Sequence, residues 1–368
     1  MVKFFLVDHL KSLSKEFKIY IFCNQENEEE VLNVLPKEIE IINLGIKRDI
    51  ALLSDIFNLL KLVFFLKEKK VFAVYSISPK GGLISSLASW VTRVPLRIHV
   101  FTGQVWVTNK GFLRILLKFF DKLICQLSTD IIIDSHSQKT FLENEGVLKK
   151  NRGIVIGRGS ISGVNVTKFF PKIVKVRNII IFLFVGRLKR DKGVFELYKA
   201  FQKIKNLGHD VELWFVGDDE EDIYNQFISL GYNLEYIKFF GYVKNPETYM
   251  QEADIFCLPS YREGFGSAVI EASACQLPTI ASRIYGLTDA IIDKKTGFLI
   301  NVGDVDDLYE KMLKLYKNKN LRVKMGIFAY NNAINNFDSR DITEKFMTFF
   351  KKRVDEIEKK RKYYSFWG

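Results

Sequence analysis

The sequence predicts an α/β protein of two doubly wound domains that face each other across a central cleft. Short runs of β-branched and aromatic residues alternate with longer segments whose apolar residues recur every three or four positions. This alternation is typical of parallel strands connected by helices that cover both faces of a sheet. It breaks once, at residues 166–178, and then resumes, and 368 residues suffice for two such domains. In doubly wound proteins the cleft is the expected ligand site.

The N-terminal domain is predicted to span residues 1–165. Its expected strands are residues 19–23, 71–76, 96–100, 131–134 and 154–156, and helices are expected at residues 50–67 and 111–127. Only 18 residues precede the first of these strands, and residues 5–17 already have helical spacing. Because a strand, a loop and a helix need more residues than this, the first strand–helix unit is predicted to be shortened or missing.

The C-terminal domain is predicted to span residues 179–335, after a basic linker without clear periodicity at residues 166–178. Its expected strands are residues 179–185, 211–216, 237–240, 255–258 and 279–282. Each strand is followed by a turn and a segment with helical spacing. Residues at the carboxyl ends of these strands are therefore the first candidates for a binding site.

The charge balance predicts an anionic partner. The chain has 55 Lys and Arg against 43 Asp and Glu, a formal net charge of +12. Nucleic acid, membrane phosphates and a phosphorylated substrate all fit this excess. The four cysteines are far apart and form no CxxC pair, and neither a membrane-spanning segment nor a signal peptide is evident. We therefore expect a cytoplasmic protein without a disulfide framework or a zinc site.

Two cations follow the first strand of the C-terminal domain. Gly186 and Arg187 come directly after the strand, and Lys192 precedes the next helix. Fixed cations at the carboxyl end of a parallel strand suit a diphosphate, although surface charge explains the pair equally well.

An acidic turn at residues 218–222 follows the second strand of this domain. Clustered carboxylates suit a magnesium or manganese ion. Acidic residues are also favoured in the first turn of a helix, and we prefer this explanation.

The third motif, residues 259–266, carries the most information. Gly264 and Gly266 flank Phe265 and leave backbone N–H groups available at the start of a helix, which suits an anion. Glu263 precedes this helix, and Glu271 lies about two turns into it. One carboxylate is thus in a position to reach a sugar ring and the other a ribose.

With these motifs in place, the sequence resembles the retaining glycosyltransferases of family 4, which have the GT-B fold of two Rossmann-like domains. The resemblance covers nearly the whole chain and is most specific at residues 184–303. The segments that carry it are FVGRLKRDKG, FVGDDEED, FFGYVKN, ADIFCLPSYREGFGSAVIEASACQLPTIAS, GLTDAI and TGFLI. The segments SISPKGGL, RIHVFTGQVW, DSHSQKTFL and GSISGVN resemble a branch that takes part in bacterial surface-polysaccharide assembly.

The resemblance implies a role for each residue of the donor site. Arg187 and Lys192, next to Gly186, would hold the diphosphate of a nucleotide sugar and stabilise the leaving nucleotide. Glu263 would bind hydroxyls of the donor sugar, and Glu271 those of the ribose. Backbone N–H groups of Gly264, Phe265 and Gly266 would line the sugar and phosphate pocket. The catalytic residues would be Glu263, Arg187 and Lys192, with neither a metal ion nor another cofactor.

The predicted acceptor side departs from the family. Many relatives have a histidine where this chain has Thr102, and His99 points to the other face of its strand by alternation, so we predict His99 to be a core or supporting residue. Thr102, Gly103 and Gln104 are the candidates for acceptor contacts. Lys80, Gly81 and Gly82 are predicted either to line the cleft or to form an ordinary turn.

The leading hypothesis is a hexosyltransferase that moves a sugar from a nucleotide sugar to a lipid-linked or polysaccharide acceptor. The alternatives are a sugar-nucleotide epimerase with the same fold and a sugar-nucleotide-binding protein with reduced activity. Nucleic-acid binding ranks last, because no recognised motif accompanies the charge.

A membrane partner is predicted from the end of the chain. The resemblance implies that residues 336–368 form a helix that crosses back to the first domain and ends in a basic, aromatic tail. Residues 351–362 contain seven basic and three acidic residues, before Tyr363, Tyr364, Phe366 and Trp367. This composition suits an anionic membrane surface, although a solvated helix face has the same pattern. We therefore expect a peripheral protein on the inner face of the plasma membrane.

Overall fold

A computed structural model describes residues 6–23, 34–45, 51–172 and 178–366. The contacts within the chain divide it into two units, residues 1–162 with 339–368 and residues 163–338. Each unit contains a parallel sheet with helices packed on it, which confirms the predicted α/β class. Among the described residues, no helix combines the length and the apolar composition that a membrane crossing requires.

The first unit begins with a helix and two short strands. Its elements are α2 (Val7–Leu13), β1 (Tyr20–Cys23), β2 (Glu40–Asn43), α4 (Leu52–Glu68), β3 (Ala73–Ser76), α5 (Pro79–Val91), β4 (Leu96–Phe101), η2 (Val105–Val107), α6 (Gly111–Leu127), β5 (Asp130–Ile133), α7 (His136–Asn144), β6 (Gly153–Ile154) and α15 (Ser339–Phe366). The strand β2 was not predicted, because none of its four residues is fully buried and its pattern is weak.

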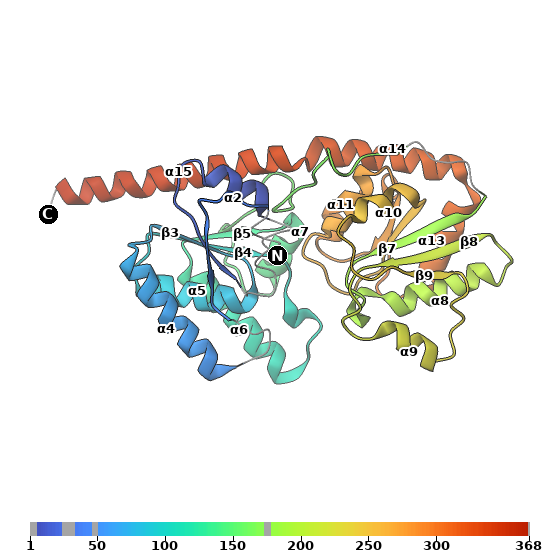
Figure 1. Ribbon diagram of the computed structural model, residues 1–368, viewed down its shortest axis with the longest axis horizontal. Coiled ribbons are helices and arrows are strands. Elements are labelled where there is room, and N and C mark those ends of the chain that lie inside the picture. Colours follow the sequence, from blue (N-terminus) through green and yellow to red (C-terminus); the bar gives the residue numbers. More distant parts are fainter. Residues whose placement is uncertain (1–5, 24–33, 46–50, 173–177, 367–368) are drawn as a thin grey trace. The chain divides into compact units, whose positions relative to one another are not determined.

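The main sheet of this unit has the order β3-β4-β5-β6 with all strands parallel, and β1 pairs separately with β2. On one side of the main sheet α4, α5 and α6 pack next to one another, and α2 and α15 lie on the other side (Figure 1). The last helix of the chain contributes Phe346 and Phe350 to a core that includes Leu96 and Ile98 of β4.

Several cations of the C-terminal segment pair within the first unit. Lys351 contacts Glu16 at 2.5 Å, and Arg353 contacts Asp130 at 2.7 Å and also Glu356. The side chains of the predicted aromatic tail, Tyr363, Tyr364, Phe366 and Trp367, lie outside the described residues. The membrane role of the tail therefore stays a prediction.

The second unit contains the larger sheet. Its elements are β7 (Ile180–Val185), η3 (Arg190–Lys192), α8 (Val194–Lys205), β8 (Val211–Val216), α9 (Ile223–Ser229), β9 (Ile237–Phe239), α10 (Pro246–Glu252), β10 (Ile255–Leu258), α11 (Ser267–Ala274), β11 (Thr279–Ser282), α12 (Leu287–Ala290), β12 (Gly297–Ile300), α13 (Val305–Lys317) and α14 (Lys319–Asn336). The six strands are parallel in the order β12-β11-β10-β7-β8-β9.

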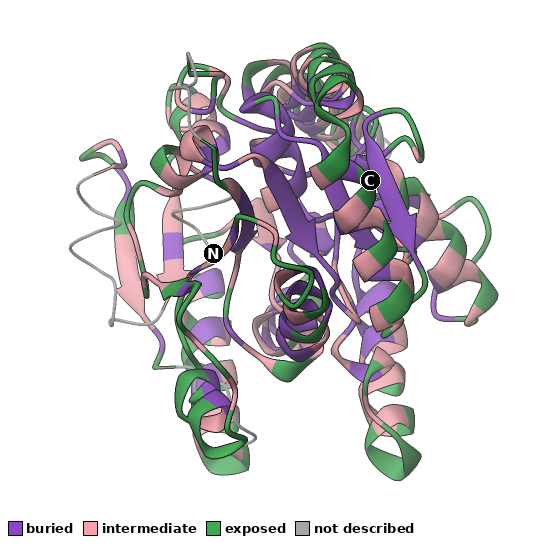
Figure 2. Cartoon of the chain, turned by 90° about the vertical axis from the view of Figure 1, so that its right-hand side faces the viewer, coloured by how far each residue is buried: buried purple, intermediate pink, exposed green. Residues whose placement is uncertain are grey.

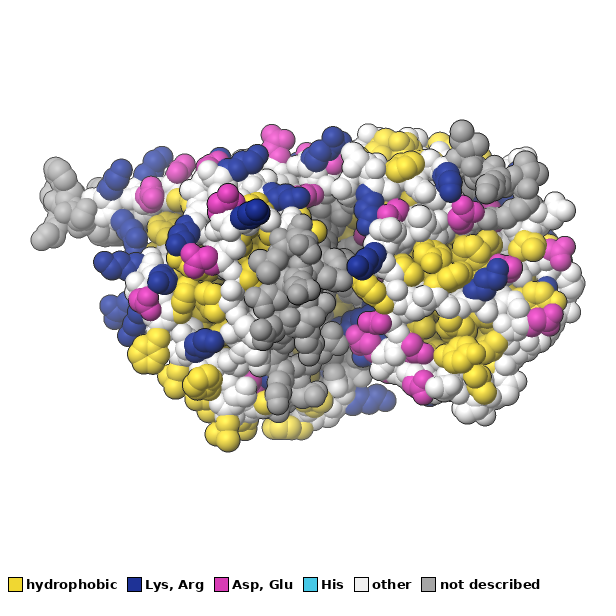
Figure 3. Space-filling view, viewed as in Figure 1, with side chains coloured by type: hydrophobic (Ala, Val, Ile, Leu, Met, Phe, Trp, Pro, Cys, Tyr) yellow, Lys and Arg dark blue, Asp and Glu magenta, His cyan; other side chains and the backbone are white. Residues whose placement is uncertain are grey.

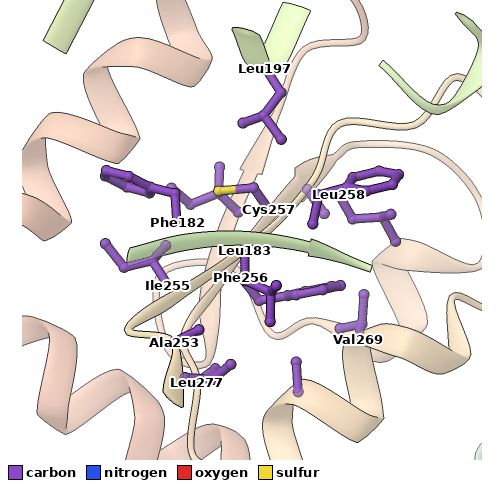
Figure 4. Close-up of a cluster of buried hydrophobic side chains, with 14 of the residues drawn as sticks. Phe182, Leu183, Leu197, Ala253, Ile255, Phe256, Cys257, Leu258, Val269 and Leu277 are labelled. Carbon is purple, nitrogen blue, oxygen red and sulfur yellow. The ribbon is translucent and has the colours of Figure 1, made fainter. Parts of the chain in front are cut away.

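The core of the second unit is built on its central strands. Phe182 and Leu183 of β7 and Phe256 of β10 are fully buried, because helices cover both faces of the sheet. Figure 4 shows side chains of β7 and β10 on both sides of the strand, with Leu197 of α8 on one side and Val269 of α11 on the other. Figure 2 shows buried strands and helices with one buried and one exposed face. This rigid sheet holds the loops at its carboxyl edge.

Candidate active site

Two loops meet at the carboxyl edge of the second sheet because β7 and β10 are neighbours. One loop follows β7 and contains Asp191, and the other follows β10 and contains Tyr261 and Arg262. The backbone N–H of Tyr261 donates to the carbonyl oxygen of Asp191 at 2.9 Å, and Nη2 of Arg262 donates to Oδ2 of Asp191 at 3.0 Å. Asp191 therefore holds the two loops together through both its backbone and its side chain.

Gly193 lets the loops approach closely. It has φ +71°, and a Cβ atom at this position would lie 2.1 Å from the carbonyl oxygen of Pro259. A side chain is excluded both by the left-handed backbone and by the contact. The start of α8 is thus packed directly against the backbone that follows β10.

The closest contact across the loops is an ion pair between Lys192 and Glu263. Nζ of Lys192 lies 2.6 Å from Oε1 of Glu263 and also donates to the carbonyl oxygen of Arg262 at 3.4 Å. The hydroxyl of Ser260 donates to the same Oε1 atom at 2.9 Å. The side chains of Lys192 and Glu263 are 12% and 16% exposed. The sequence identified both residues but not Ser260, whose spacing of three residues from Glu263 is the signal that could have indicated it.

The glycine-flanked segment combines a buried ring with unpaired backbone donors. Phe265 is 1% exposed, and its ring centre lies 5.2 Å from that of Phe337, so this side chain anchors the loop in the core. Gly266, with φ +84°, precedes α11. In the part of the chain that the structure describes, no group accepts a hydrogen bond from the backbone N–H of Gly264, Phe265 or Gly266. These donors remain available for an anion, as predicted from the motif.

Glu271 lies on α11 and is half-buried. Its pKa is raised to about 7, chiefly by burial; the charge of Lys168 lowers the pKa and the charge of Glu247 raises it. Lys168 itself contacts Glu247 at 3.3 Å. A carboxyl group that titrates near neutral pH is able both to donate and to accept a hydrogen bond, which suits contact with hydroxyl groups.

Arg187 contacts a different carboxylate from Lys192. Nη1 of Arg187 lies 3.2 Å from Oε2 of Glu220, and Lys189 contacts the same oxygen at 3.4 Å. The backbones of the two loops are close here, since a Cβ atom on Gly217 would lie 2.0 Å from the carbonyl oxygen of Gly186. The two cations predicted to share one diphosphate thus have separate carboxylate partners among the described residues.

The acidic turn at residues 218–222 supports a helix. Oδ1 of Asp219 accepts a hydrogen bond from the N–H of Ile223 at 2.7 Å, and Oδ2 accepts one from Tyr224 at 2.9 Å. Glu220 and Glu221 contact the neighbouring cations. The carboxylates are therefore used at the start of α9 and in ion pairs, which agrees with the preferred explanation of this motif.

The predicted acceptor-side residues belong to the first unit. Thr102 and Gly103 follow β4 and are partly exposed. Gln104 is 1% exposed, and its Oε1 atom accepts a hydrogen bond from Gln138 at 3.2 Å. The side chain of Gln104 supports this loop from inside the unit, and an acceptor contact by any of the three residues stays a prediction.

Lys80 and Gly81 lie in the first turn of α5, and His99 lies behind it. Lys80 contacts Asp55 of α4 at 2.7 Å, and Gly81 packs against Ser78. A Cβ atom on the following residue, Gly82, would lie 2.3 Å from the ring of His99. The segment is therefore the start of a helix and not an open glycine-rich loop.

His99 is a core residue, which confirms the prediction for this position. It is 1% exposed, packs against Phe101 with 4.7 Å between ring centres, and contacts the hydroxyl of Ser76 through Nδ1 at 2.9 Å. Burial lowers its pKa to about 3, so its ring is neutral at physiological pH.

Comparison with known proteins identifies the family. Residues 165–332 match the model for glycosyl transferases group 1. The chain is 32% identical to the capsular polysaccharide biosynthesis glycosyltransferase CapM of Staphylococcus aureus, over 95% of this chain and 91% of that protein. It is 27% identical to the UDP-Gal:alpha-D-GlcNAc-diphosphoundecaprenol alpha-1,3-galactosyltransferase of Escherichia coli, over 84% of this chain and 80% of that protein.

Solved structures show the same fold. The sucrose-phosphate synthase of Thermosynechococcus elongatus superimposes with a TM-score of 0.78 at 19% identity, over 95% of this chain and 92% of that one. The relatives named above are transferases and do not support the epimerase alternative. The chain belongs to the group 1 glycosyl transferases and is a glycosyltransferase with the GT-B fold.

Proposed function

We propose that this glycosyltransferase moves a sugar from a nucleoside diphosphate donor to a lipid-linked glycan during assembly of a surface polysaccharide, with retention of the anomeric configuration and without a metal ion. The observation that carries the proposal is the Lys192–Glu263 pair, a cation and a carboxylate 2.6 Å apart at the carboxyl ends of β7 and β10. A nucleotide sugar has groups that complement both members of this pair: its diphosphate binds a cation, and its sugar hydroxyls donate hydrogen bonds to a carboxylate.

In the proposed donor site each predicted residue contacts a part of the nucleotide sugar. Lys192 and Arg187 bind the diphosphate, and the free N–H groups of Gly264, Phe265 and Gly266 bind phosphate or sugar oxygens. Glu263 accepts hydrogen bonds from hydroxyls of the donor sugar. Glu271 binds the ribose, and Gly186 lets the backbone approach the phosphates.

The proposed reaction breaks the bond between the anomeric carbon of the donor and the oxygen of the leaving diphosphate. The acceptor hydroxyl attacks the anomeric carbon from the same face, and an oxygen of the leaving phosphate takes its proton. Negative charge builds on the diphosphate as the bond breaks, and Lys192, Arg187 and the backbone N–H groups stabilise it. This route needs neither a nucleophilic side chain nor a metal ion.

The lipid-linked acceptor is proposed from the relatives. The name of the E. coli relative gives a diphosphoundecaprenol-linked sugar as its acceptor, and that of the S. aureus relative gives capsular polysaccharide biosynthesis. We assign the acceptor side to the loop of Thr102, Gly103 and Gln104 after β4, and to Lys80 and Gly81, which follow the neighbouring strand β3. An acceptor of this kind is confined to a membrane, so the enzyme would work as a peripheral protein at its inner face.

Transfer assays with the purified protein test this function. UDP-, GDP- and ADP-sugars are each incubated with a short-chain polyprenyl diphosphate sugar, and the product is identified by mass spectrometry and by the anomeric coupling constant in its NMR spectrum. We expect one donor class to give a product with retained anomeric configuration, and Lys192→Ala and Glu263→Ala each to lower kcat by about 10²–10³-fold. A matched control is Lys238→Ala, because Lys238 forms an exposed ion pair with Glu212 on the β8–β9 side of the same unit.

Four outcomes contradict the proposal. Formation of an epimeric nucleotide sugar without acceptor supports the epimerase. Nucleotide-sugar binding by thermal shift without turnover on any acceptor supports a binding protein. Full activity of Glu263→Ala removes this residue from the mechanism, and an inverted product excludes same-face attack.

A further inference from the structure

The helix α4 is apolar on both sides. Asn58, Leu62 and Leu66 are buried on the side of the helix that packs against the rest of the first unit. The opposite side carries six exposed apolar residues, of which Leu53 is 87% and Phe64 72% exposed. The six residues are Leu52, Leu53, Ile56, Phe57, Leu60 and Phe64. A helix of a soluble domain normally turns a polar side to water, so this outward apolar stripe requires a separate explanation.

A second stripe lies on α6. Phe112 is 78%, Ile115 67% and Phe119 55% exposed, and their spacing of three and four residues aligns them on one side of the helix. α5 packs against both α4 and α6, so the three helices form one layer on the same side of the β3–β6 sheet (Figure 1). Figure 3 shows hydrophobic side chains gathered over α4 and α6 along the lower edge of this unit. We call this layer's outer surface, with the two stripes, the α4–α6 face.

The segment that builds the α4–α6 face also carries most of the net positive charge of the first unit. Residues 51–127 contain eleven Lys and Arg but only three Asp and Glu. All three carboxylates are engaged. Asp121 accepts a hydrogen bond from the buried indole of Trp106 at 2.7 Å, Asp55 pairs with Lys80, and Glu68 pairs with Lys69 at 2.9 Å. Residues 1–50, by contrast, contain seven basic and nine acidic residues. Among these cations, Lys61 and Lys67 of α4 and Lys110 directly before α6 are exposed, so the two helices that carry the apolar stripes also carry exposed cations.

We propose that the α4–α6 face docks onto the surface of an anionic lipid bilayer, with the outward Leu, Ile and Phe side chains inserted among the lipids and the cations at the phosphates. Exposed apolar side chains suit the acyl chains of such a bilayer, and basic residues suit its negatively charged headgroups. This inference rests on the proposed function, since a lipid-linked acceptor brings the enzyme to a membrane.

Charge selects the bilayer over a second copy of the chain. In a symmetric dimer the same basic segment would face itself, and like charges oppose association. An anionic bilayer offers the opposite charge and accepts apolar side chains without a complementary protein surface. The interaction is peripheral, because no described helix is suited to crossing the membrane.

Vesicle flotation of the full chain tests the proposal. The vesicles are phosphatidylcholine alone or phosphatidylcholine with phosphatidylglycerol, at low and high salt. Wild-type protein is expected to float with the anionic vesicles at low salt and much less with neutral ones. The variant Leu53→Ser/Phe57→Ser/Phe64→Ser on α4, and the variant Phe112→Ser/Ile115→Ser/Phe119→Ser on α6, should each lower the partition coefficient at least tenfold.

A matched control is the variant Ile228→Ser/Leu230→Ser, which removes apolar side chains that are 52% and 56% exposed on the second unit. It should float like the wild type. All the substituted side chains are more than half exposed, so thermal unfolding is expected to stay within a few degrees of the wild type, and circular dichroism checks this. The proposal is overturned if both triple variants bind vesicles as strongly as the wild type, or if the wild type does not float. A wild-type dimer in light scattering that either triple variant dissociates also overturns it.

A transfer assay separates this proposal from the proposed function. On a water-soluble short-chain acceptor both triple variants should keep wild-type activity, whereas on an acceptor embedded in anionic vesicles they should lose at least tenfold. Activity without vesicle binding by the wild type refutes the docking face and leaves the function intact. Vesicle binding that depends on both stripes, in an enzyme inactive on every acceptor, supports the docking face and refutes the function.

Discussion

Nζ of Lys192 lies 2.6 Å from Oε1 of Glu263, although the two residues are 71 positions apart in the sequence, because their loops follow neighbouring strands. The same carboxylate oxygen accepts the hydroxyl of Ser260. The ion pair and the hydrogen bond from Ser260 therefore orient both charged groups before a substrate binds. This arrangement suits a site in which charge develops during the reaction, since preorganised groups need no rearrangement at that moment.

The first prediction concerns coupling between these two residues. Lys192→Ala and Glu263→Ala should each lower kcat by about 10²–10³-fold, the size seen when one preorganised charge-stabilising group is removed. Because each side chain positions the other, the double variant Lys192→Ala/Glu263→Ala should lose much less than the product of the two single effects. Steady-state kinetics of the four proteins measure this.

If the two residues act independently, the factors by which the single substitutions lower kcat should multiply in the double variant. If the double variant loses about 10⁴-fold or more, the ion pair is not the unit that acts in the reaction. Ser260→Ala serves as a milder probe of the same carboxylate, and its effect should disappear in the Glu263→Ala background.

The second prediction concerns the close approach of the two loops at Gly193. Gly193→Ala combines a left-handed backbone, φ +71°, with a Cβ atom 2.1 Å from the carbonyl oxygen of Pro259. We expect a loss of about 2–4 kcal/mol in the free energy of unfolding, because the two loops must move apart. Urea denaturation of the purified protein gives this value.

Gly208 offers a matched control for this substitution. It has a similar φ of +77°, but a Cβ atom at this position would have no neighbour within 4 Å, so Gly208→Ala bears only the backbone strain, about 1 kcal/mol. The difference between the two variants isolates the contact with Pro259. Equal losses for both would show that the loops are not tightly packed at this point.

The strands of the second unit were predictable to within about a residue. Residues 211–216, 255–258 and 279–282 coincide with β8, β10 and β11, because buried parallel strands are continuous apolar runs bounded by turns. The strands β2 and β12 were missed. None of the four residues of β2 is fully buried, whereas β12 is as long and as buried as β10.

The candidate site was predictable in its residues but not in its contacts. The motifs identified Lys192 and Glu263, while the link from Asp191 to Arg262 depends on β10 lying beside β7, an order that spacing along the chain does not reveal. In the same way, the spacing of α4 predicted a helix packed on a sheet. With apolar residues on both sides, periodicity did not distinguish the buried side from the exposed one.

The third prediction concerns the pH dependence of stability. The pKa of Glu271 is raised from 4.5 to about 7 in the folded protein, chiefly by burial. The folded state therefore binds a proton that the unfolded state releases between pH 4.5 and 7, so this group stabilises the fold at low pH and the contribution is lost as the pH rises through 7. Glu271→Gln should remove this dependence and stabilise the protein at pH 8 by up to ~3 kcal/mol.

Urea denaturation of both proteins at pH 5, 6 and 8 measures the difference. The gain in stability of Glu271→Gln over the wild type should increase from pH 5 to pH 8. A constant difference would mean that Glu271 titrates at its ordinary pKa. In the proposed site the ribose hydroxyls favour the carboxylate, so nucleotide binding by the wild type should tighten as the pH rises from 6 to 8, and Glu271→Gln should bind more weakly without this change.

The fourth prediction concerns the partner of Arg187. Nη1 of Arg187 lies 3.2 Å from Glu220, and the Arg187 side chain is 47% exposed. If Arg187 binds the donor diphosphate, Glu220 competes with the phosphates for it. Glu220→Gln should then strengthen binding of a nucleoside diphosphate by about 2–10-fold, a gain of about 0.5–1.4 kcal/mol, and this gain should shrink at high salt.

Isothermal titration calorimetry at two salt concentrations measures this effect. Glu212→Gln is the control, because it removes the same charge from an ion pair with Lys238 on the β8–β9 side of the unit. Arg187→Ala should weaken binding of the nucleoside diphosphate. In the Arg187→Ala background, Glu220→Gln should not change this affinity, since Glu220 competes with the phosphates only for the guanidinium of Arg187. Unchanged affinity of Glu220→Gln in the wild-type background, together with unchanged affinity of Arg187→Ala, would exclude Arg187 from the diphosphate site and leave Lys192 and the backbone N–H groups as its ligands.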